Sequence, residues 1–292
     1  MFQRILVPLD GSDLAERALP FASFLAKANG GQVILMRAID TWATHVDMGE
    51  EAARHPEIEA ELSRLASRLT SEGVPHATVS VAYGEAASLI ESTAASTRAD
   101  LIVMSTHGRR GIAKWAYGSV AERVFRLSTR PILFIPAQAT ATWSVDTSVL
   151  LPLDGSEVAE QALPFAEALA RSLKAAINIL QVVEPVPVTV GAGADLAPLI
   201  DYNELLQAAE PYGAGVAHKL RDRGMPAAAK TVLGYAAASI VDEAEALSAR
   251  AIVMASHGRT GLERAVMGSV ATGVVQRANQ PVLVVHATQP TE

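Results

Sequence analysis

The chain repeats itself at the size of a domain. The segment Val-Pro-Leu-Asp-Gly-Ser at residues 7–12 returns 144 residues later as Leu-Pro-Leu-Asp-Gly-Ser. Further along the offset becomes 150, and 15 of the 38 aligned positions between residues 99–136 and 249–286 are identical. A repeat this long indicates a duplicated domain, because solenoid repeats are several times shorter. At roughly 150 residues per domain, the 292 residues make two copies.

The offset and the composition indicate where the copies begin and end. The predicted domains cover residues 1–137 and 148–287, and the Ala/Thr-rich segment 137–147 between them follows neither a helical nor a strand period. The offset grows by six residues between the second and third predicted strands. There residues 40–56 are charged, whereas residues 184–201 are rich in Pro, Gly and Ala.

Strand-like and helix-like segments alternate within each copy. Apolar β-branched runs predict strands, and apolar residues at helical spacing predict helices. In the first copy the predicted strands are 4–9, 32–39, 77–82, 101–104 and 131–135, and the predicted helices are 13–28, 57–72, 86–96 and 118–127. Each copy is therefore predicted to be an α/β domain, a doubly wound five-stranded parallel sheet of order 3-2-1-4-5 with helices on both faces.

This topology predicts the place of a ligand. In such a sheet the strand order reverses between the first and fourth strands, and ligands bind beyond their carboxyl ends. Asp10-Gly11-Ser12 follows the first predicted strand, and Ser105-Thr106-His107-Gly108 ends the fourth. Both segments are among the best repeated parts of the chain. Repeat and topology therefore indicate the same spot independently.

The segment after the fourth strand has the features of a phosphate site. Gly108 lets the backbone approach an anion, and Gly118-Ser119 opens a helix whose free N–H groups and dipole favour phosphate. Arg109 adds positive charge nearby. An alternative is that the glycine only shapes a turn and Ser119 only caps a helix. The same spacing recurs in the second copy, at Ala255, Gly258, Arg259, Gly268 and Ser269.

These motifs resemble those of the universal stress protein family, over nearly the whole chain and as two tandem domains. The resemblance rests on the opening Pro-Leu-Asp-Gly-Ser and on the family's nucleotide motif, Gly-x2-Gly-x9-Gly followed by Ser or Thr. The chain departs from that motif at its first position, where Ser105 and Ala255 replace glycine. Both residues are small and leave the backbone route open. The resemblance implies an adenine nucleotide alpha hydrolase-like fold.

The resemblance also implies ATP, with or without Mg²⁺, in each domain. In ATP-binding relatives the aspartate after strand one and a residue at the end of strand two lie by adenine and ribose, and the motif loop and helix start hold the phosphates. In the first copy this implies Pro8, Asp10, Ala38, Ser105, His107, Gly108, Arg109, Gly118, Ser119 and Val120. In the second copy it implies Pro152, Asp154, Val182, Ala255, His257, Gly258, Arg259, Gly268, Ser269 and Val270.

Two kinds of candidate residue have a second interpretation. Asp10 and its counterpart Asp154 precede a helix, so they could cap it, as could Ser12 and Ser156. His107 and His257 could be general bases, but no acid is paired with either, and we expect them to hold the loop or to contact phosphate.

The histidines near residue 50 give a weak metal signal. His45 and His55 are close to Asp47, Glu50 and Glu51. Their spacing of ten matches no helical ligand pattern, and the second copy lacks them. We therefore expect a solvated loop and no metal.

Several classes of protein are excluded or disfavoured. The sequence has no P-loop lysine motif, no Gly-x-Gly-x-x-Gly after the first strand and no Gly-x-Ser-x-Gly elbow. No cysteine is present, which excludes disulfides, thiolate metal sites and cysteine nucleophiles. The net charge of −7 disfavours a nucleic-acid partner. No apolar run approaches the roughly 18 residues of a membrane span, and no secretory signal is evident. We expect a cytoplasmic protein.

The sequence thus predicts an ATP-binding, stress-response regulatory protein with slow or no hydrolysis and no catalytic residues. One alternative is a protein-interaction module of the same fold that binds an unidentified protein and no nucleotide. Another is a weak ATPase with His107 or His257 as base. The last strands, 131–135 and 281–285, would leave open sheet edges. We expect them to pair the copies about a pseudo-two-fold axis, and two chains to form a homodimer.

Overall fold

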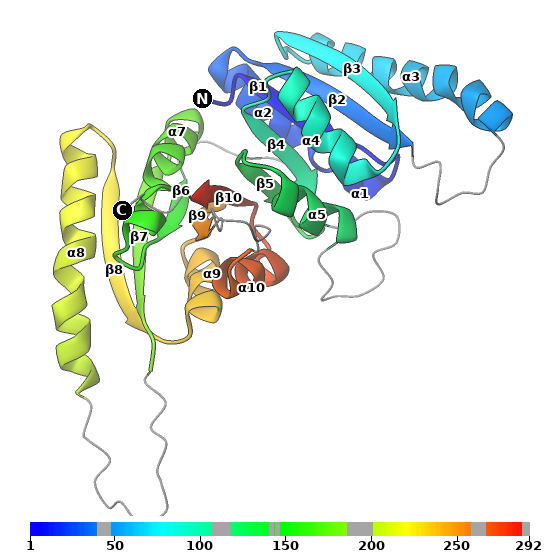
Figure 1. The fold of residues 1–292 in the computed structure, drawn as a ribbon. Coiled ribbons are helices and arrows are strands. Elements are labelled where there is room, and N and C mark those ends of the chain that lie inside the picture. The colour runs from blue at the N-terminus through cyan, green and yellow to red at the C-terminus, as the bar shows by residue number, and fades with distance from the viewer. Residues whose placement is uncertain are drawn as a thin grey trace, which may run out of the picture.

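One ten-stranded sheet runs through both copies of the repeat (Figure 1). The computed structural model describes residues 1–39, 48–106, 118–139, 143, 147–185, 201–257 and 267–287. Its strand order is β3-β2-β1-β4-β5-β10-β9-β6-β7-β8. Each half therefore has the order 3-2-1-4-5 that the sequence predicts, and within each half all strands are parallel.

Strands and helices alternate along the first copy. Its strands are β1 (Arg4–Pro8), β2 (Gln32–Ile39), β3 (His76–Tyr83), β4 (Leu101–Ser105) and β5 (Ile132–Ile135). Its helices are α1 (Asp13–Glu16), α2 (Leu19–Asn29), α3 (Met48–Ser71), α4 (Ala86–Ser96) and α5 (Ser119–Leu127).

The second copy follows the same alternation. Its strands are β6 (Ser148–Pro152), β7 (Ala176–Val183), β8 (Ala227–Leu233), β9 (Ala251–His257) and β10 (Val282–Ala287). Its helices are α6 (Glu157–Glu160), α7 (Leu163–Leu173), α8 (Tyr202–Asp222), α9 (Ala236–Ala246) and α10 (Ser269–Arg277).

The two halves join through their last strands, as expected. β5 and β10 pair antiparallel, with Leu133 opposite Leu283 and one further pair on each side. These two leucines are equivalent in the repeat, so a pseudo-two-fold axis passes between them. Both are buried, and the junction closes two apolar edges that would otherwise expose unpaired backbone groups.

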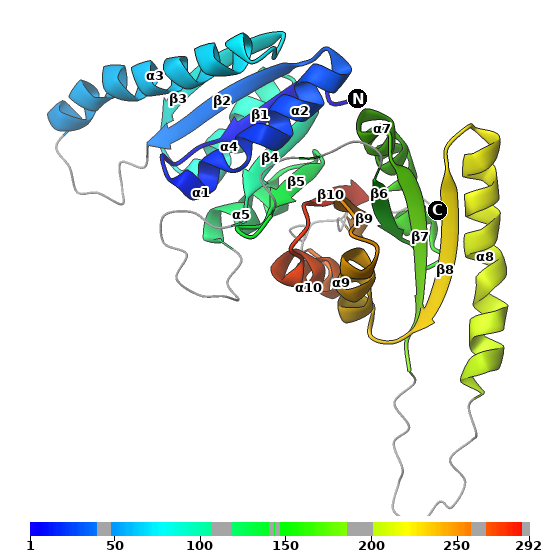
Figure 2. The ribbon, with the colours of Figure 1, turned by 180° about the vertical axis from the view of Figure 1, so that it is seen from behind.

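Two apolar layers cover the sheet, one on each face, as a doubly wound fold requires. One layer packs α2, α3, α7 and α8 against the strands, and the other packs α4, α5, α9 and α10. Figure 2 views the molecule from behind, so that α2 of the first layer lies in front of the strands. Trp143 ties the halves together in the first layer: its ring lies edge-on to Phe21 with centroids 5.1 Å apart, and its indole N–H donates to the Arg250 carbonyl at 2.8 Å.

One predicted helix is wrong as a single element. The segment 13–28 is split into α1 and α2, because Pro20 has no N–H to donate to the preceding turn and starts a new helix instead. The same break occurs before Pro164 in the second copy.

The segment around His55 is a second correction. The sequence predicts a solvated loop, but α3 begins at Met48 and carries His55 within it. The imidazole stacks on Tyr83 and lies 3.1 Å from the phenol oxygen through Nδ1. His45 and Asp47 lie outside the described residues. Among the helices of the described segments, none is both long and apolar enough to cross a membrane.

Candidate functional site

The first and fourth strands of each copy separate toward their carboxyl ends. β1 and β4 pair only at Ile5–Leu101 and Leu6–Ile102, although the strands continue to Pro8 and Ser105. In the second copy β6 and β9 likewise share two pairs. The backbone between these strand ends is therefore not closed by a ladder, which is the place where this topology binds ligands.

Asp10 stands directly beyond β1 and is held in a fixed turn. Its Oδ1 accepts hydrogen bonds from the Ser12 backbone N–H at 2.9 Å and from the Ser12 hydroxyl at 2.6 Å. Gly11 between them has φ +82°, a conformation that favours glycine. Ser12 in turn accepts from the Ala15 N–H and caps α1. Asp10 is therefore the residue that orients the cap, and Ser12 is the cap itself.

The second copy builds the same turn. Asp154 Oδ1 accepts from the Ser156 N–H at 3.0 Å and from its hydroxyl at 2.6 Å, and Gly155 has φ +87°. Ser156 caps α6 through the Ala159 N–H. Two copies that differ in much of their surface thus hold this carboxylate in one geometry.

The start of α5 lies beside the end of β4. The Gly118 N–H donates to the Thr106 carbonyl at 2.9 Å, so the two ends of the segment that carries the motif meet. Gly118 is the N-cap and supplies no side-chain hydrogen bond. The predicted alternative that Ser119 caps this helix is wrong, because Ser119 is the first helical residue. Ser119 and Val120 are exposed, and the first-turn N–H groups have no acceptor within the helix.

The start of α10 is built in the same way with one change. The Gly268 N–H donates to the Ser256 hydroxyl at 3.0 Å, where the first copy uses a carbonyl. Thr106 and Ser256 are 3% and 2% exposed. Thr106 is named from the sequence only as part of the segment that ends the fourth strand, and Ser256 is not named, although a hydroxyl residue before the histidine in both copies is a signal for this role.

The remaining predicted site residues fall into two groups. Pro8 and Pro152 end β1 and β6, Ala38 and Val182 lie one residue before the ends of β2 and β7, and Ala255 lies in β9. The strand β9 reaches His257, whose backbone pairs with Ala287. The other motif-loop residues, His107, Gly108, Arg109, Gly258 and Arg259, lie outside the described residues.

Glu85 and Arg123 form a polar rim beside the first site. Glu85 caps α4 by accepting from the Ala87 and Ser88 N–H groups, and Arg123 of α5 donates to its Oε1 at 3.1 Å. Burial raises the pKa of the Glu85 carboxyl, but the hydrogen bonds from Ser88 and Ala87 and the Arg123 charge outweigh burial and lower it. Sequence reasoning missed this pair because its members are 38 residues apart.

The second copy has no counterpart to that pair. Tyr235 and Gly273 stand at the equivalent positions, and Tyr235 is 72% exposed. The N–H of Ala236 at the start of α9 is taken instead by Glu184, at 3.0 Å. The rim of the second site therefore has an exposed aromatic side chain, Tyr235, where the rim of the first site has the ion pair of Glu85 and Arg123.

Comparisons with known proteins agree with this architecture. The sequence model of the universal stress protein family matches residues 1–136 and 147–286. A universal stress protein of Mycolicibacterium smegmatis is 26% identical over an alignment of 299 positions that covers 97% of this chain and 96% of that protein. A universal stress protein of Methanocaldococcus jannaschii is 33% identical over 137 residues, covering 47% of this chain and 80% of that protein.

A solved structure shows the same fold over the whole length. The crystal structure of a universal stress protein from Archaeoglobus fulgidus superposes with a TM-score of 0.75 at 20% identity, covering 98% of this chain and 99% of that one. At this identity the likeness shows the fold alone. The family matches in both halves decide the assignment: this chain belongs to the universal stress protein family and consists of two tandem copies of its domain.

Proposed function

We propose that this chain binds one adenine nucleotide, ATP, in each domain and acts as a regulatory protein of the stress response. The observation that carries the proposal is the repeated geometry at the strand ends. Each copy places an oriented aspartate beyond its first strand and a glycine-capped helix start beyond its fourth. These are the parts that the family resemblance assigns to nucleotide binding.

The helix starts are suited to the phosphates. A helix N-terminus presents unpaired N–H groups and the positive end of the helix dipole. Gly118 and Gly268 add no side chain that would compete for those groups. Arg109 and Arg259 are the cations that the motif adds. An acidic protein can therefore bind an anion locally, through backbone groups and one arginine per site.

The aspartate turns are suited to the other end of the nucleotide. Because Ser12 and Ser156 engage one carboxylate oxygen of Asp10 and Asp154, the orientation of each carboxylate is set before a ligand arrives, which lowers the entropic cost of binding. Such a carboxylate would accept a hydrogen bond from a ribose hydroxyl. Ala38 and Val182, one residue before the ends of neighbouring strands, are the residues that the family resemblance assigns to the adenine and ribose.

The residues present favour binding over fast hydrolysis. The sequence has no P-loop lysine, the group that stabilises the leaving phosphates in efficient NTPases. The described residues contain no group of three or more metal-ligating side chains. A Mg²⁺ ion accompanying the nucleotide would bind the phosphate oxygens and keep several waters, as is usual for this ion.

Release and titration test the proposal directly. We expect the purified chain, once denatured, to release an adenine nucleotide that chromatography identifies, or the nucleotide-free chain to bind ATP on calorimetric titration. The double variant Ser119→Asp with Ser269→Asp adds a negative charge at each helix start. That charge repels phosphate but favours the helix dipole, so affinity should fall about tenfold or more while the melting temperature is kept.

A matched variant controls for charge alone. Ser92→Asp makes the same substitution, with one added charge, on the exposed side of α4 and six residues from the start of that helix, and should leave ATP binding unchanged. If no adenine nucleotide is released and none binds on titration, the proposal fails. The chain would then be better explained as an interaction module that acts through a protein partner.

A further inference from the structure

The sheet has two ends, and the chain itself leaves both open. β5 and β10 pair with each other at the junction between the copies and with β4 and β9 on their other sides. They therefore cannot also join two chains edge to edge. The outermost strands of the ten are β3 and β8. Within the described residues each pairs on one side only, β3 with β2 and β8 with β7. An outer strand presents a row of N–H and C=O groups that can pair with another strand.

The two outer strands differ in how they are protected. β8 carries Lys230 at its centre, and the ammonium is 2.6 Å from Glu243 Oε2. If β8 paired antiparallel with its own copy about this residue, two lysines would stand directly opposite each other, which is unfavourable. A charged side chain of this kind is a common protection of a sheet edge.

β3 has no such protection. Its eight residues, His-Ala-Thr-Val-Ser-Val-Ala-Tyr, include no Lys, Arg, Asp, Glu or Pro. The position equivalent to Lys230 is Ser80. In an antiparallel pair, residues directly opposite each other point to the same face of the sheet. A two-fold axis relating two β3 strands must therefore place one residue opposite its own copy. Val79 and Ser80 are the two residues at the centre of the strand. In either register only uncharged or histidine side chains oppose one another.

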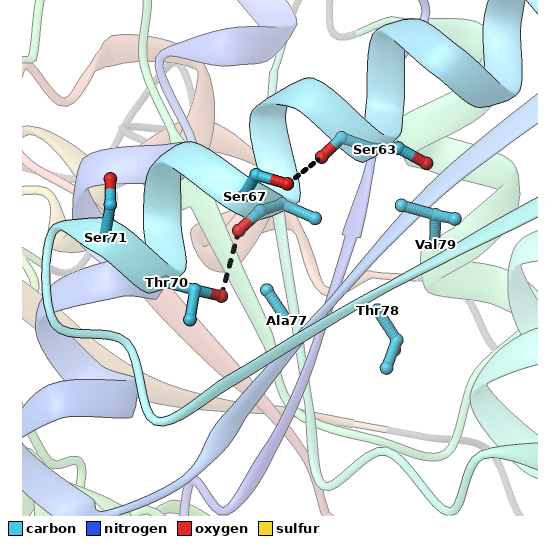
Figure 3. A pocket seen from close by; sticks show the side chains of 8 residues that line it. Ser63, Ser67, Thr70, Ser71, Ala77, Thr78 and Val79 are labelled. Carbon is cyan, nitrogen blue, oxygen red and sulfur yellow. Dashed lines mark hydrogen bonds between the residues drawn. The ribbon is translucent and has the colours of Figure 1, made fainter.

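A groove opens along this strand (Figure 3). It measures about 710 Å³ and lies between α3 and β3. The helix lines it with small residues, Ser63, Ala66, Ser67, Thr70 and Ser71. The hydroxyls of the last three donate to carbonyls of their own helix. This wall therefore demands no polar partner, and the unpaired hydrogen-bonding groups belong to the strand edge.

The molecule already contains one junction of this kind. At β5–β10 the same strand of each copy meets its equivalent antiparallel, about Leu133 and Leu283, and continues the sheet. We propose that β3 does the same between chains: a second copy of this protein adds its own β3 antiparallel to the first, and the two α3 helices meet over the shared edge. This interface does not depend on the nucleotide.

Exchanging the residues at the two edges tests the interface. Light scattering on the full-length protein should give about twice the chain mass of 30.7 kDa. Ser80→Lys transfers the protection of β8 to β3, at a position where the other copy tolerates lysine, and should raise the dimer dissociation constant about tenfold or more. Lys230→Ser removes that protection from β8 and should leave the dimer intact.

Each result decides the proposal. A wild-type mass of one chain at all concentrations overturns it, and so does a Ser80→Lys protein that dimerises as tightly as wild type. Loss of the dimer in Lys230→Ser would place the contact on β8, and masses beyond two chains would mean β3 pairs with β8 in an open array; both overturn it. Circular dichroism checks folding. If Ser80→Lys does not fold, Thr78→Lys, exposed and on the same face of β3, replaces it with the same expected outcome.

Discussion

The two copies agree where their first and fourth strands end and differ in what surrounds that place. In both, an aspartate accepts a hydrogen bond from a serine hydroxyl at 2.6 Å, and the glycine between these two residues has a positive φ. A second glycine caps the helix after the fourth strand. Next to these shared parts, one copy has Glu85 bridged to Arg123 and the other has the exposed Tyr235.

This contrast separates the parts that the proposed nucleotide site needs from those it does not. The turn and the helix start are set by backbone geometry, so a duplicate that changes them loses the site. The start of the neighbouring helix needs some acceptor for its N–H groups; Glu85 accepts from two of them in the first copy, and Glu184 accepts from one in the second. We therefore expect the two sites to share their phosphate chemistry and to differ in selectivity or affinity at the rim.

The largest expected loss of stability concerns the junction of β5 and β10, where equivalent substitutions in the two copies should have equal effects. Leu133→Ala and Leu283→Ala each remove a buried side chain on the pseudo-two-fold axis. Each should lower the free energy of unfolding by about 3 kcal/mol, because the lost apolar contact leaves a cavity. Urea denaturation measures both. A loss confined to one variant would mean that the junction is not symmetric.

The next effect should occur in one copy only. His286 of β10 stacks on Phe125 of α5 with ring centroids 4.2 Å apart, whereas the first copy has Pro136 at the equivalent position. Burial lowers the pKa of His286 to about 4. The unfolded chain, with an ordinary pKa near 6.5, therefore gains a proton before the folded one does, and stability falls as the pH drops from about 6.5 to 4.

A His286→Leu variant isolates that contribution. At pH 5 the protonation of the unfolded histidine should cost the wild type about 2 kcal/mol. The variant should lack this part of the decrease, so its unfolding free energy relative to that of the wild type should rise by about 2 kcal/mol between neutral pH and pH 5. Parallel profiles between pH 6.5 and 5 would show that His286 titrates normally and that the contact with Phe125 does not exclude its charged form.

The smallest effect compares the two rims. Glu85→Ala removes a helix cap and the Arg123 partner and should cost about 1 kcal/mol at pH 7. Since the pKa of Glu85 is lowered in the fold, its contribution is present above the ordinary carboxyl pKa and is lost as the pH falls through the folded pKa. Tyr235→Ala is the matched change in the second copy and should cost less than about 0.5 kcal/mol. Equal losses in thermal or urea unfolding would remove the distinction between the rims.

Local patterns in the sequence were enough to predict most of the fold. The strand 32–39 and the helix 86–96 have the predicted bounds, because each is a continuous apolar or amphipathic run with clear ends. The predicted helix 13–28 is interrupted before Pro20, because the run of good helix formers around this proline hides the break that it causes. The start of α3 failed because a charged segment with a proline also fits a loop.

The site could be predicted only as far as it is local. Asp10-Gly11-Ser12 is a sequence motif, and the structure shows the turn that it makes. The bridge from Arg123 to Glu85 and the free edge of β3 depend on which elements become neighbours in space. No pattern within one segment carries that information, so both emerge only from the folded arrangement.

Counting the bound nucleotides tests the central claim most directly. Calorimetric titration of the nucleotide-free chain with ATP should give two equivalents per chain. Ser119→Asp and Ser269→Asp should each weaken one equivalent about tenfold or more, and the double variant should weaken both, because each added charge repels the phosphates proposed to bind at that helix start. Two equivalents of unchanged affinity in both single variants would contradict the account, as would a wild-type chain that binds no ATP.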